Sequence, residues 1–267
     1  MAKKILFINQ AIGGFTQGGI ADMGKIVPTK VVQEGFEVRV FSPKWGNINE
    51  RRGQLHEVIR LSGMNIIIKE TDHPLVIKVA SMPAAKSQAY FIDNDDYFLK
   101  RLQDVDEDGK PYDDNGERAV FYARGVLETV KKLRWIPDVI HCQGWMSYIV
   151  PFFLRTAYAD EPCFAQSKVV TSIFNHNLEG TVCEDFRECL AYRDVTAECL
   201  ADYPEAISYN DLAKIAIDNS DGVIEAAADI LPDVVAHAEA SGKPLLKFPG
   251  DDFAAAYAKF YDDILNV

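Results

Sequence analysis

Apolar runs and amphipathic stretches alternate along the first 43 residues. Residues 3–9, KKILFIN, form a continuous apolar run bounded by charge, which predicts a strand buried on both faces. The glycine-rich stretch 11–19 follows, and helical periodicity then covers about 20–33, with Pro28 predicting a kink. A second apolar run covers 36–43. This order of strand, helix and strand predicts a parallel pair joined by a right-handed crossover.

The spacing of the apolar runs then becomes shorter. Four runs, at 56–63, 65–71, 74–82 and 88–94, are too close together to leave room for crossover helices. Such spacing is typical of hairpins or a meander. A polar loop over 103–117 ends this part of the chain.

The alternation of strands and helices resumes in the second half. The elements it predicts are a helix over 117–135, a strand from 137 to about 143, a helix near 144–157, a strand over 167–177, a helix near 209–219, a strand over 222–226 and an amphipathic helix over 251–266. We therefore expect an α/β fold with one Rossmann-like domain. Its sheet would be mostly parallel, with helices on both faces and an added hairpin or meander region. Residues 1–230 would form the domain, and 231–267 a helical tail that packs back on it.

Composition limits the partners and the location. Hydrophobic residues make up 48% and charged residues 25%, which are ordinary values for a globular protein. The net charge of −12, from 28 basic and 40 acidic residues, argues against nucleic acid, because phosphate neutralisation needs clustered Lys and Arg. The chain shows no signal peptide and no apolar run of membrane-spanning length. We expect a cytoplasmic protein with no membrane partner.

The five cysteines are odd in number and contain no C-x-x-C pair, which favours reduced thiols. Cys183, Cys189 and Cys199 follow His176 in the sequence, but their spacings of six and ten match no common pair of zinc ligands. We therefore expect ordinary thiols and no bound metal.

The glycine-rich stretch is a candidate binding loop. Glycines let a backbone approach a phosphate, and the start of the following helix supplies free N–H groups. The stretch Gly13–Gly19 matches neither G-x-G-x-x-G nor G-x-x-x-x-G-K-[ST], and Ser42 and Lys44 stand where a dinucleotide fold carries an acidic residue. A phosphate or sugar site and a tight structural turn both remain open. The candidate binding residues are Thr16, Gln17, Gly18, Gly19 and Asp22.

An acidic loop at 104–109, DVDEDG, matches the first half of a calcium-binding loop. Asp104, Asp106 and Asp108 would be the ligands. Asn115 stands at position twelve, where the pattern needs a bidentate Glu. A solvated acidic loop is therefore the favoured interpretation.

Several collinear segments resemble the bacterial glycogen synthases and plant starch synthases. The segments are GGIADMGKIVPTKVVQEGFEVRVFSPKWG at 18–46, YFIDNDDYF at 90–98, DDNGERAVFYARGVLE at 113–128, PDVIHCQGWMSYIVPFFLR at 137–155, VVTSIFNHNLEG at 169–180 and DLAKIAIDNSDGVIEAAADI at 211–230. Together they span about residues 3 to 230 in the order of the family.

This resemblance implies a fold of GT-B type, in which two Rossmann-like domains enclose the active site. The chain corresponds to the N-terminal domain, which carries most of the acceptor surface. The C-terminal domain, which holds most of the nucleotide-sugar site, is expected to be absent. The implied reaction transfers glucose from ADP-glucose or UDP-glucose to an α-1,4-glucan such as glycogen, with no further cofactor. The implied acceptor-cleft residues are Tyr97, His141, Gln143, Trp145, Asn175, His176 and Glu179.

The chain departs from the family pattern at positions that carry chemistry. Thr16 replaces the lysine of K-x-G-G. In the block H-x-H-D-W-H, Gln143 and Gly144 replace the second His and the Asp, and Met146 replaces the last His, which in the family lies at the reacting sugar. Phe174 replaces the His of V-H-N. A thioether can neither donate a hydrogen bond nor stabilise developing charge, so we expect little transfer activity.

Three functions remain open, and so does the question whether the chain is itself an enzyme. The first is a glucan-binding or regulatory protein that is inactive alone, using Trp145, Tyr148, Tyr97 and Phe98 as stacking platforms unless these rings pack in the core. The second is an active glucosyltransferase, either alone or completed by a separate C-terminal half. The expected protein partner is such a half or a second copy of the chain in a homo-oligomer. The third is a binder of another small molecule through Gly13–Gly19. His176, Glu179 and Asp185 could also form a replacement acid/base set or be plain loop residues.

Overall fold

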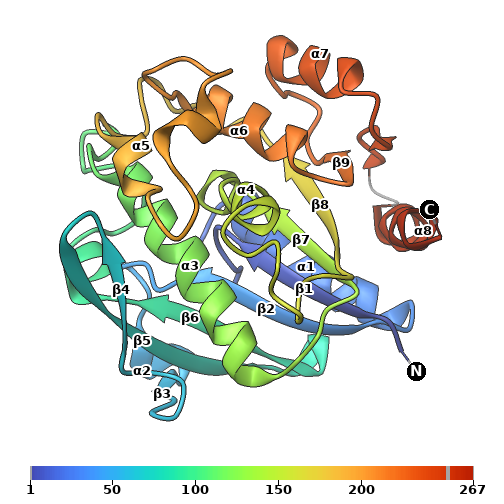
Figure 1. Cartoon of the computed structure of the whole chain (residues 1–267). Helices are drawn as coiled ribbons and strands as arrows, with labels where there is room; N and C mark the ends of the chain where they lie inside the picture. The colour runs from blue at the N-terminus through green and yellow to red at the C-terminus, as the bar shows by residue number, and fades with distance from the viewer. Residues whose placement is uncertain (1, 251–252, 267) are drawn as a thin grey trace.

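The computed structural model describes residues 2–250 and 253–266. Its centre is a sheet with the strand order β10-β9-β8-β7-β1-β2-β6-β5-β3, and β4 pairs with β5 (Figure 1). The strands are β1 (Lys4–Asn9), β2 (Glu37–Pro43), β3 (His56–Glu57), β4 (Met64–Ile68), β5 (Thr71–Met82), β6 (Ser87–Asp93), β7 (Val139–Gln143), β8 (Lys168–Ile173), β9 (Gly222–Glu225) and β10 (Leu245–Leu246).

All pairs from β10 to β6 are parallel, whereas β5 pairs antiparallel with β6, β3 and β4. The predicted fold class, a mostly parallel α/β sheet with a meander region, is therefore confirmed. The parallel strands are buried on both faces, which explains why their sequences are continuously apolar.

Helices cover both faces of the sheet. They are α1 (Gly19–Gln33), α2 (Glu50–Gly53), α3 (Asn115–Leu133), α4 (Val150–Arg155), α5 (Phe186–Cys189), α6 (Tyr209–Asp218), α7 (Pro232–Ala240) and α8 (Phe253–Leu265). Short 3-10 turns lie at η1 (Pro83–Ala85), η3 (Trp145–Ser147) and η4 (Ala197–Leu200), and one π-helical turn, η2, spans Asp95–Leu99. Figure 1 shows α3 crossing in front of the sheet, while α1 packs with α8.

The structure differs from the predicted elements at three places. The strand predicted over 56–63 shrinks to β3, because a hydrogen-bonded turn follows it in which Leu61 N donates to Val58 O. The helix predicted near 144–157 divides into η3 and α4, and Pro151 stands in the first turn of α4, where its missing N–H costs nothing. The region after 230 holds a second helix, α7, and the edge strand β10, which periodicity did not reveal.

The C-terminal helix α8 lies against the body of the sheet. Its Tyr261 hydroxyl lies 2.7 Å from Nδ1 of His141 on β7. Gly222 lets the helix approach, since a Cβ at this position would collide with Ile264. The first two residues of the predicted helix, 251–252, lie outside the described residues.

Candidate functional site

Three parallel strands end side by side at one edge of the sheet. In the register of β1, β7 and β8, Asn9 pairs with Gln143 and Gln143 pairs with Ser172. The loops that follow these strands therefore meet at the carboxyl edge, which is where open α/β sheets bind ligands.

Three adjoining cavities lie along this edge, and we call them together the rim cleft. The first, of about 680 Å³, is lined by Gly14, Phe15, Thr16, Gln17, Gly18, Asp22, Asn47, Asn49, Arg52, Gly53 and Gln103. The second, of about 220 Å³, is lined by Gln10, Ala11, Gln17, Gly18, Gly19, Ile20, Ala21, Trp45, Gln103, Asp104 and His176. The third, of about 420 Å³, is lined by Asn175, His176, Asn177, Leu178, Glu179, Gly180, Ser208, Tyr209, Asn210 and Leu231. Shared lining residues join the first cavity to the second and the second to the third.

The glycine loop forms one wall of the rim cleft. Gly18 has a φ of 110° and directly precedes α1, and no side chain caps this helix start. A Cβ at Gly18 or Gly19 would meet nothing within 4 Å, so the backbone here borders open space. Gln17 is exposed and lines two of the cavities. By contrast, Thr16 is buried and its hydroxyl donates to Ile12 O at 3.1 Å, so this hydroxyl is engaged within the loop.

Eight of the sixteen polar residues that line the rim cleft carry an amide side chain. The amides are Gln10, Gln17, Asn47, Asn49, Gln103, Asn175, Asn177 and Asn210. An amide offers both a donor and an acceptor, which matches a hydroxyl group. Among the described residues that line these three cavities, Arg52 is the one Lys or Arg.

Asp104 lines the second cavity, and two side chains fix its carboxylate there. Its Oδ2 accepts from Gln10 Nε2 at 3.1 Å and from Trp145 Nε1 at 2.9 Å. Asp104 is the first residue of the candidate calcium loop, but its carboxylate is bonded to two side chains that line or support the rim cleft. The side-chain amide of Asn115 fixes the backbone of the same residue, because it donates to Asp104 O at 2.8 Å. It also donates to the Tyr209 hydroxyl at 2.7 Å.

The other acidic residues of the loop do not converge with Asp104. Asp106 Oδ1 accepts from the backbone N–H groups of Asp108 and Lys110, which closes a turn within the loop. Over residues 2–250 and 253–266, these three aspartates form no group whose carboxylates lie close enough to share one ion. The Asp106 carboxylate therefore stabilises the turn of its own loop.

The residues at the end of β7 lie in the core instead of in the cleft. His141 is fully buried, with Nε2 at 2.6 Å from Ser172 Oγ and Nδ1 at 2.7 Å from the Tyr261 hydroxyl. Burial lowers the pKa of His141 to about 3, so its imidazole is neutral at physiological pH. Met146 is also fully buried. Gln143 is buried too, and neither of its amide atoms has a partner among the described residues.

The aromatic side chains proposed for stacking on sugars are core residues. Trp145, Tyr148 and Phe98 are fully buried, and Tyr97 is 3% exposed. The structure therefore favours the alternative of core packing for all four rings. Trp145 packs against a residue of the cleft instead: its indole meets the ring of Tyr209 in a T-shaped arrangement, and Tyr209 lines the third cavity.

The loop after β8 does reach the rim cleft. Asn175, His176 and Glu179 all line the third cavity, and His176 also lines the second. Nε2 of His176 lies 3.1 Å from the Tyr148 hydroxyl, while its Nδ1 has no partner among the described residues. The half-buried ring has a lowered pKa because of desolvation, which argues against a protonated acid at this position. Asp185 lies outside the rim cleft and pairs with Lys69.

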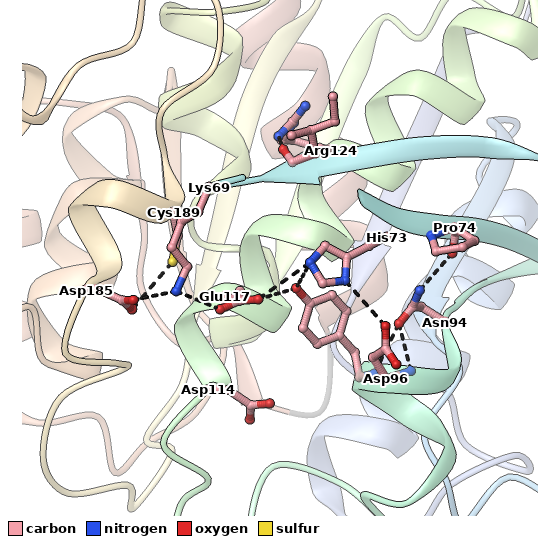
Figure 2. A network of polar contacts seen from close by, with 12 residues as sticks. Lys69, His73, Pro74, Asn94, Asp96, Asp114, Glu117, Arg124, Asp185 and Cys189 are labelled. Carbon is pink, nitrogen blue, oxygen red and sulfur yellow. Dashed lines mark hydrogen bonds and ion pairs between the residues drawn. The ribbon is translucent and has the colours of Figure 1, made fainter. Parts of the chain in front are cut away.

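A separate polar network joins Glu117 of α3 to His73 and Lys69 (Figure 2), and Tyr97 belongs to it. Its hydroxyl donates to Glu117 and lies 2.9 Å from His73 Nε2. Glu117 in turn pairs with Lys69, whose Nζ lies 3.3 Å from Oε2. Burial and the neighbouring carboxylate of Glu117 raise the pKa of Tyr97, so this phenol stays protonated. The structure therefore does not bring Tyr97 to the rim cleft with the other predicted acceptor residues.

Several residues of the rim cleft were not predicted. Gln10, Asn49, Arg52, Gln103 and Asn210 carry no motif that marks them. Gln10 could have been predicted from its position, because it directly follows a buried parallel strand, and the carboxyl ends of such strands border ligand sites. The others come from loops whose path the sequence did not define.

The mostly parallel sheet with helices on both faces is shared with a starch synthase catalytic domain, so the class of protein is an α/β domain of GT-B glycosyltransferase type. The profile of the starch synthase catalytic domain matches residues 4–239, and the chain belongs to this family. No helix among residues 2–250 and 253–266 combines the length and apolarity needed to cross a membrane.

Individual relatives agree with this assignment. The chain is 37% identical over 179 residues to the glycogen synthase of Chlorobium phaeobacteroides, and 36% identical over 179 residues to that of Pelodictyon phaeoclathratiforme. Each match covers 66% of this chain and 37% of the relative, so the aligned part spans well under half of these enzymes. The catalytic domain of starch synthase IV from Arabidopsis thaliana, solved with ADP and acarbose, shares the fold with a TM-score of 0.68. That match covers 92% of this chain and 51% of the plant chain at 15% identity.

Proposed function

We propose that this domain binds α-1,4-glucan in the rim cleft and transfers no glucose on its own. The observation that carries the proposal is the lining of the cleft, which is rich in amides and holds one cation, Arg52. Amides suit the hydroxyl groups of a neutral sugar chain. The diphosphate of a nucleotide is usually neutralised by several positive charges, and Arg52 is the one Lys or Arg in this lining, so the uncapped start of α1 would have to hold a diphosphate almost alone.

The replaced positions support the second half of the proposal. Family membership makes glucosyl transfer the reaction to test, yet Met146 is apolar and buried and His141 is neutral and bonded on both ring nitrogens. Neither side chain can donate to a sugar in the cleft. Transition-state stabilisation in a sugar transfer depends on donors aimed at developing charge.

Affinity electrophoresis through glycogen tests the binding. We expect the wild-type chain to be retarded and the double variant Q17A/Q103A to bind about 30-fold more weakly, because each lost hydrogen bond is worth about 1 kcal/mol. Asn65→Ala is the matched control, since Asn65 is an exposed amide on β4 that lies outside the rim cleft. Unchanged mobility of the wild-type chain in glycogen would refute the proposal.

A transfer assay with radiolabelled ADP-glucose or UDP-glucose tests the absence of activity. We expect no label in glycogen from the chain alone, and transfer by the chain alone would contradict this half of the proposal.

Membership of a glycosyltransferase family favours a second candidate function, the completion of an active enzyme by a separate nucleotide-sugar-binding half. Label transfer that requires both this chain and the C-terminal half of a related glycogen synthase would establish it. The third function considered, a small-molecule binder at Gly13–Gly19, would appear as a nucleotide-dependent rise in the melting temperature.

A further inference from the structure

A fourth cavity, of about 790 Å³, lies beside the rim cleft and has a different chemistry. It is lined by Lys110, Pro111, Tyr112, Asp113, Asp114, Glu117, Glu179, Gly180, Thr181, Cys183, Glu184, Asp185 and Glu188. Seven of these side chains are carboxylates. The cavity shares Glu179 and Gly180 with the rim cleft but contains none of its amides.

Two thiols and one carboxylate converge at the wall of this cavity. The Sγ atoms of Cys183 and Cys189 and a carboxylate oxygen of Asp185 all lie within 4.8 Å of one another. Cys189 Sγ is 3.7 Å from Asp185 Oδ1. Both cysteines are buried. Over the described part of the chain, no other three His, Cys, Asp or Glu side chains meet in this way.

Local structure fixes these three residues. Val182, next to Cys183, is held on both sides, because its N–H donates to Ile207 O at 2.9 Å and its carbonyl accepts from Gly116 N at 2.7 Å. The carbonyl of Asp185 accepts from Cys189 N at 3.2 Å and begins the single turn of α5. This turn places residues 185 and 189 on one face. The spacing C-x-D-x3-C therefore gives a preformed set of donors.

The distances suit a tetrahedral zinc ion. Zinc–sulfur bonds of about 2.3 Å and zinc–oxygen bonds of about 2.0 Å, at the tetrahedral angle, put sulfur and oxygen about 3.5 Å apart. The observed separation of Cys189 Sγ and Asp185 Oδ1 is 3.7 Å. Thiolate ligands select zinc over calcium and magnesium, which prefer oxygen.

The ammonium group of Lys69 lies next to the three candidate zinc ligands. Figure 2 shows the ammonium group of Lys69 reaching Asp185 and Glu117 next to Cys189. Lys69 lies in the turn between β4 and β5, and its side chain is 34% exposed. It can therefore swing into water when a metal ion takes its place beside Asp185.

We propose that Cys183, Asp185 and Cys189 form a zinc site with three protein ligands and one open position facing the fourth cavity. On binding, each thiol releases its proton to solvent and forms a sulfur–zinc bond, so the step needs no oxidant or reductant. A fourth position left to water or to an added ligand distinguishes this arrangement from a closed structural site with four protein ligands. The site is independent of glucan binding in the rim cleft.

Competition with a chromophoric zinc chelator, in the presence of a phosphine reductant, tests the site on the full chain. We expect one equivalent of Zn²⁺ per chain, and at least about tenfold weaker binding in Cys183→Ser and in Cys189→Ser, since loss of a ligand exceeds the loss of a supporting contact. Cys199→Ser is the matched control, because Cys199 is exposed and outside the cluster. Equal zinc uptake by the wild type and both serine variants, or an equal loss in Cys199→Ser, would overturn the proposal.

Cobalt gives an independent spectroscopic readout. Co²⁺ bound by two thiolates produces a sulfur-to-cobalt charge-transfer band, which should fall in each single-cysteine variant and persist in Cys199→Ser. Absence of this band in the wild-type chain contradicts the proposed ligands.

Lys69→Met tests the site without removing a ligand. Because the ammonium competes for Asp185, its loss should tighten zinc binding, and the variant remains informative even if a serine variant fails to fold. Zinc binding that is unchanged or weaker in a folded Lys69→Met protein would count against the site.

Discussion

The neutral, buried state of His141 makes a measurable prediction about stability and pH. A histidine placed in an open acceptor cleft would titrate near neutrality. In the structure, His141 is fully buried between Ser172 and Tyr261, and burial lowers its pKa from 6.5 to about 3. The folded protein therefore binds no proton on His141 between pH 7.5 and 5, whereas the unfolded chain does. Acidification over this range thus favours the unfolded state.

The size of the effect follows from the two pKa values. In the unfolded chain the pKa of His141 is about 6.5, about 1.5 units above pH 5. Protonation at pH 5 therefore stabilises the unfolded chain by about 2 kcal/mol, at about 1.36 kcal/mol per pH unit. Protonation at pH 5 stabilises the folded state by almost nothing, because the pKa of His141 in the folded state is about 3, two units below this pH. At pH 7.5 neither state gains much. His141 should therefore lower the free energy of unfolding by about 2 kcal/mol between pH 7.5 and 5.

Urea unfolding at several pH values, followed by circular dichroism, measures this contribution. His141→Gln should cost about 1–3 kcal/mol at pH 7.5, because Tyr261 or Ser172 loses a partner, and this cost should shrink by about 2 kcal/mol at pH 5. The exposed His56 provides the control, and His56→Gln should follow the wild type. An identical pH dependence of stability in wild type and His141→Gln would refute the burial of His141.

Three further variants test other parts of the structure. Gly222→Ala should reduce the free energy of unfolding by about 1–3 kcal/mol, because the added methyl group collides with Ile264 and displaces α8; urea titration measures it. Met146→His should give no glucose transfer to glycogen, and transfer by this variant would contradict the proposed function. Its free energy of unfolding should fall by about 1–3 kcal/mol, because the substitution places a polar ring at a fully buried position. Arg118→Met should reduce the free energy of unfolding by about 1–3 kcal/mol and speed proteolysis of the acidic loop, because the carbonyls of Tyr97 and Gln103 lose their buried donor; wild-type proteolysis rates would show that these hydrogen bonds do not hold the loop.

The sheet could be predicted from the sequence because its strands are covered on both faces. Runs such as KILFIN in β1 are wholly apolar, and their alternation with amphipathic stretches leaves few topologies open. The edge and tail elements were harder. β10 has two residues, and α7 buries only Val234 and Ala238, so its apolar stripe is too weak to define a helix by periodicity.

The site was harder to predict, because exposure is a tertiary property. The pattern predicted a strand from 137 to about 143, and β7 confirms it, but the pattern could not show that α8 covers His141 or that Tyr209 packs on Trp145. Asp104 illustrates the same limit. Its sequence neighbours resemble a calcium loop, whereas its carboxylate is fixed by Gln10 and Trp145 from distant segments.

Binding and transfer place different demands on the same cleft. A glucan in its ground state needs matched donors and acceptors, which amides such as Gln17 and Gln103 provide. Transfer needs groups that bind the transition state more tightly than the ground state, namely donors at the reacting sugar and cations at the departing diphosphate. The resemblance puts the buried Met146 at the position of the family's donor to the sugar, and Arg52 is the one Lys or Arg that lines the rim cleft. Substitutions that weaken glucan binding should therefore leave the transfer rate of the isolated domain at zero, and a nucleotide-sugar-binding partner would have to supply the missing charge.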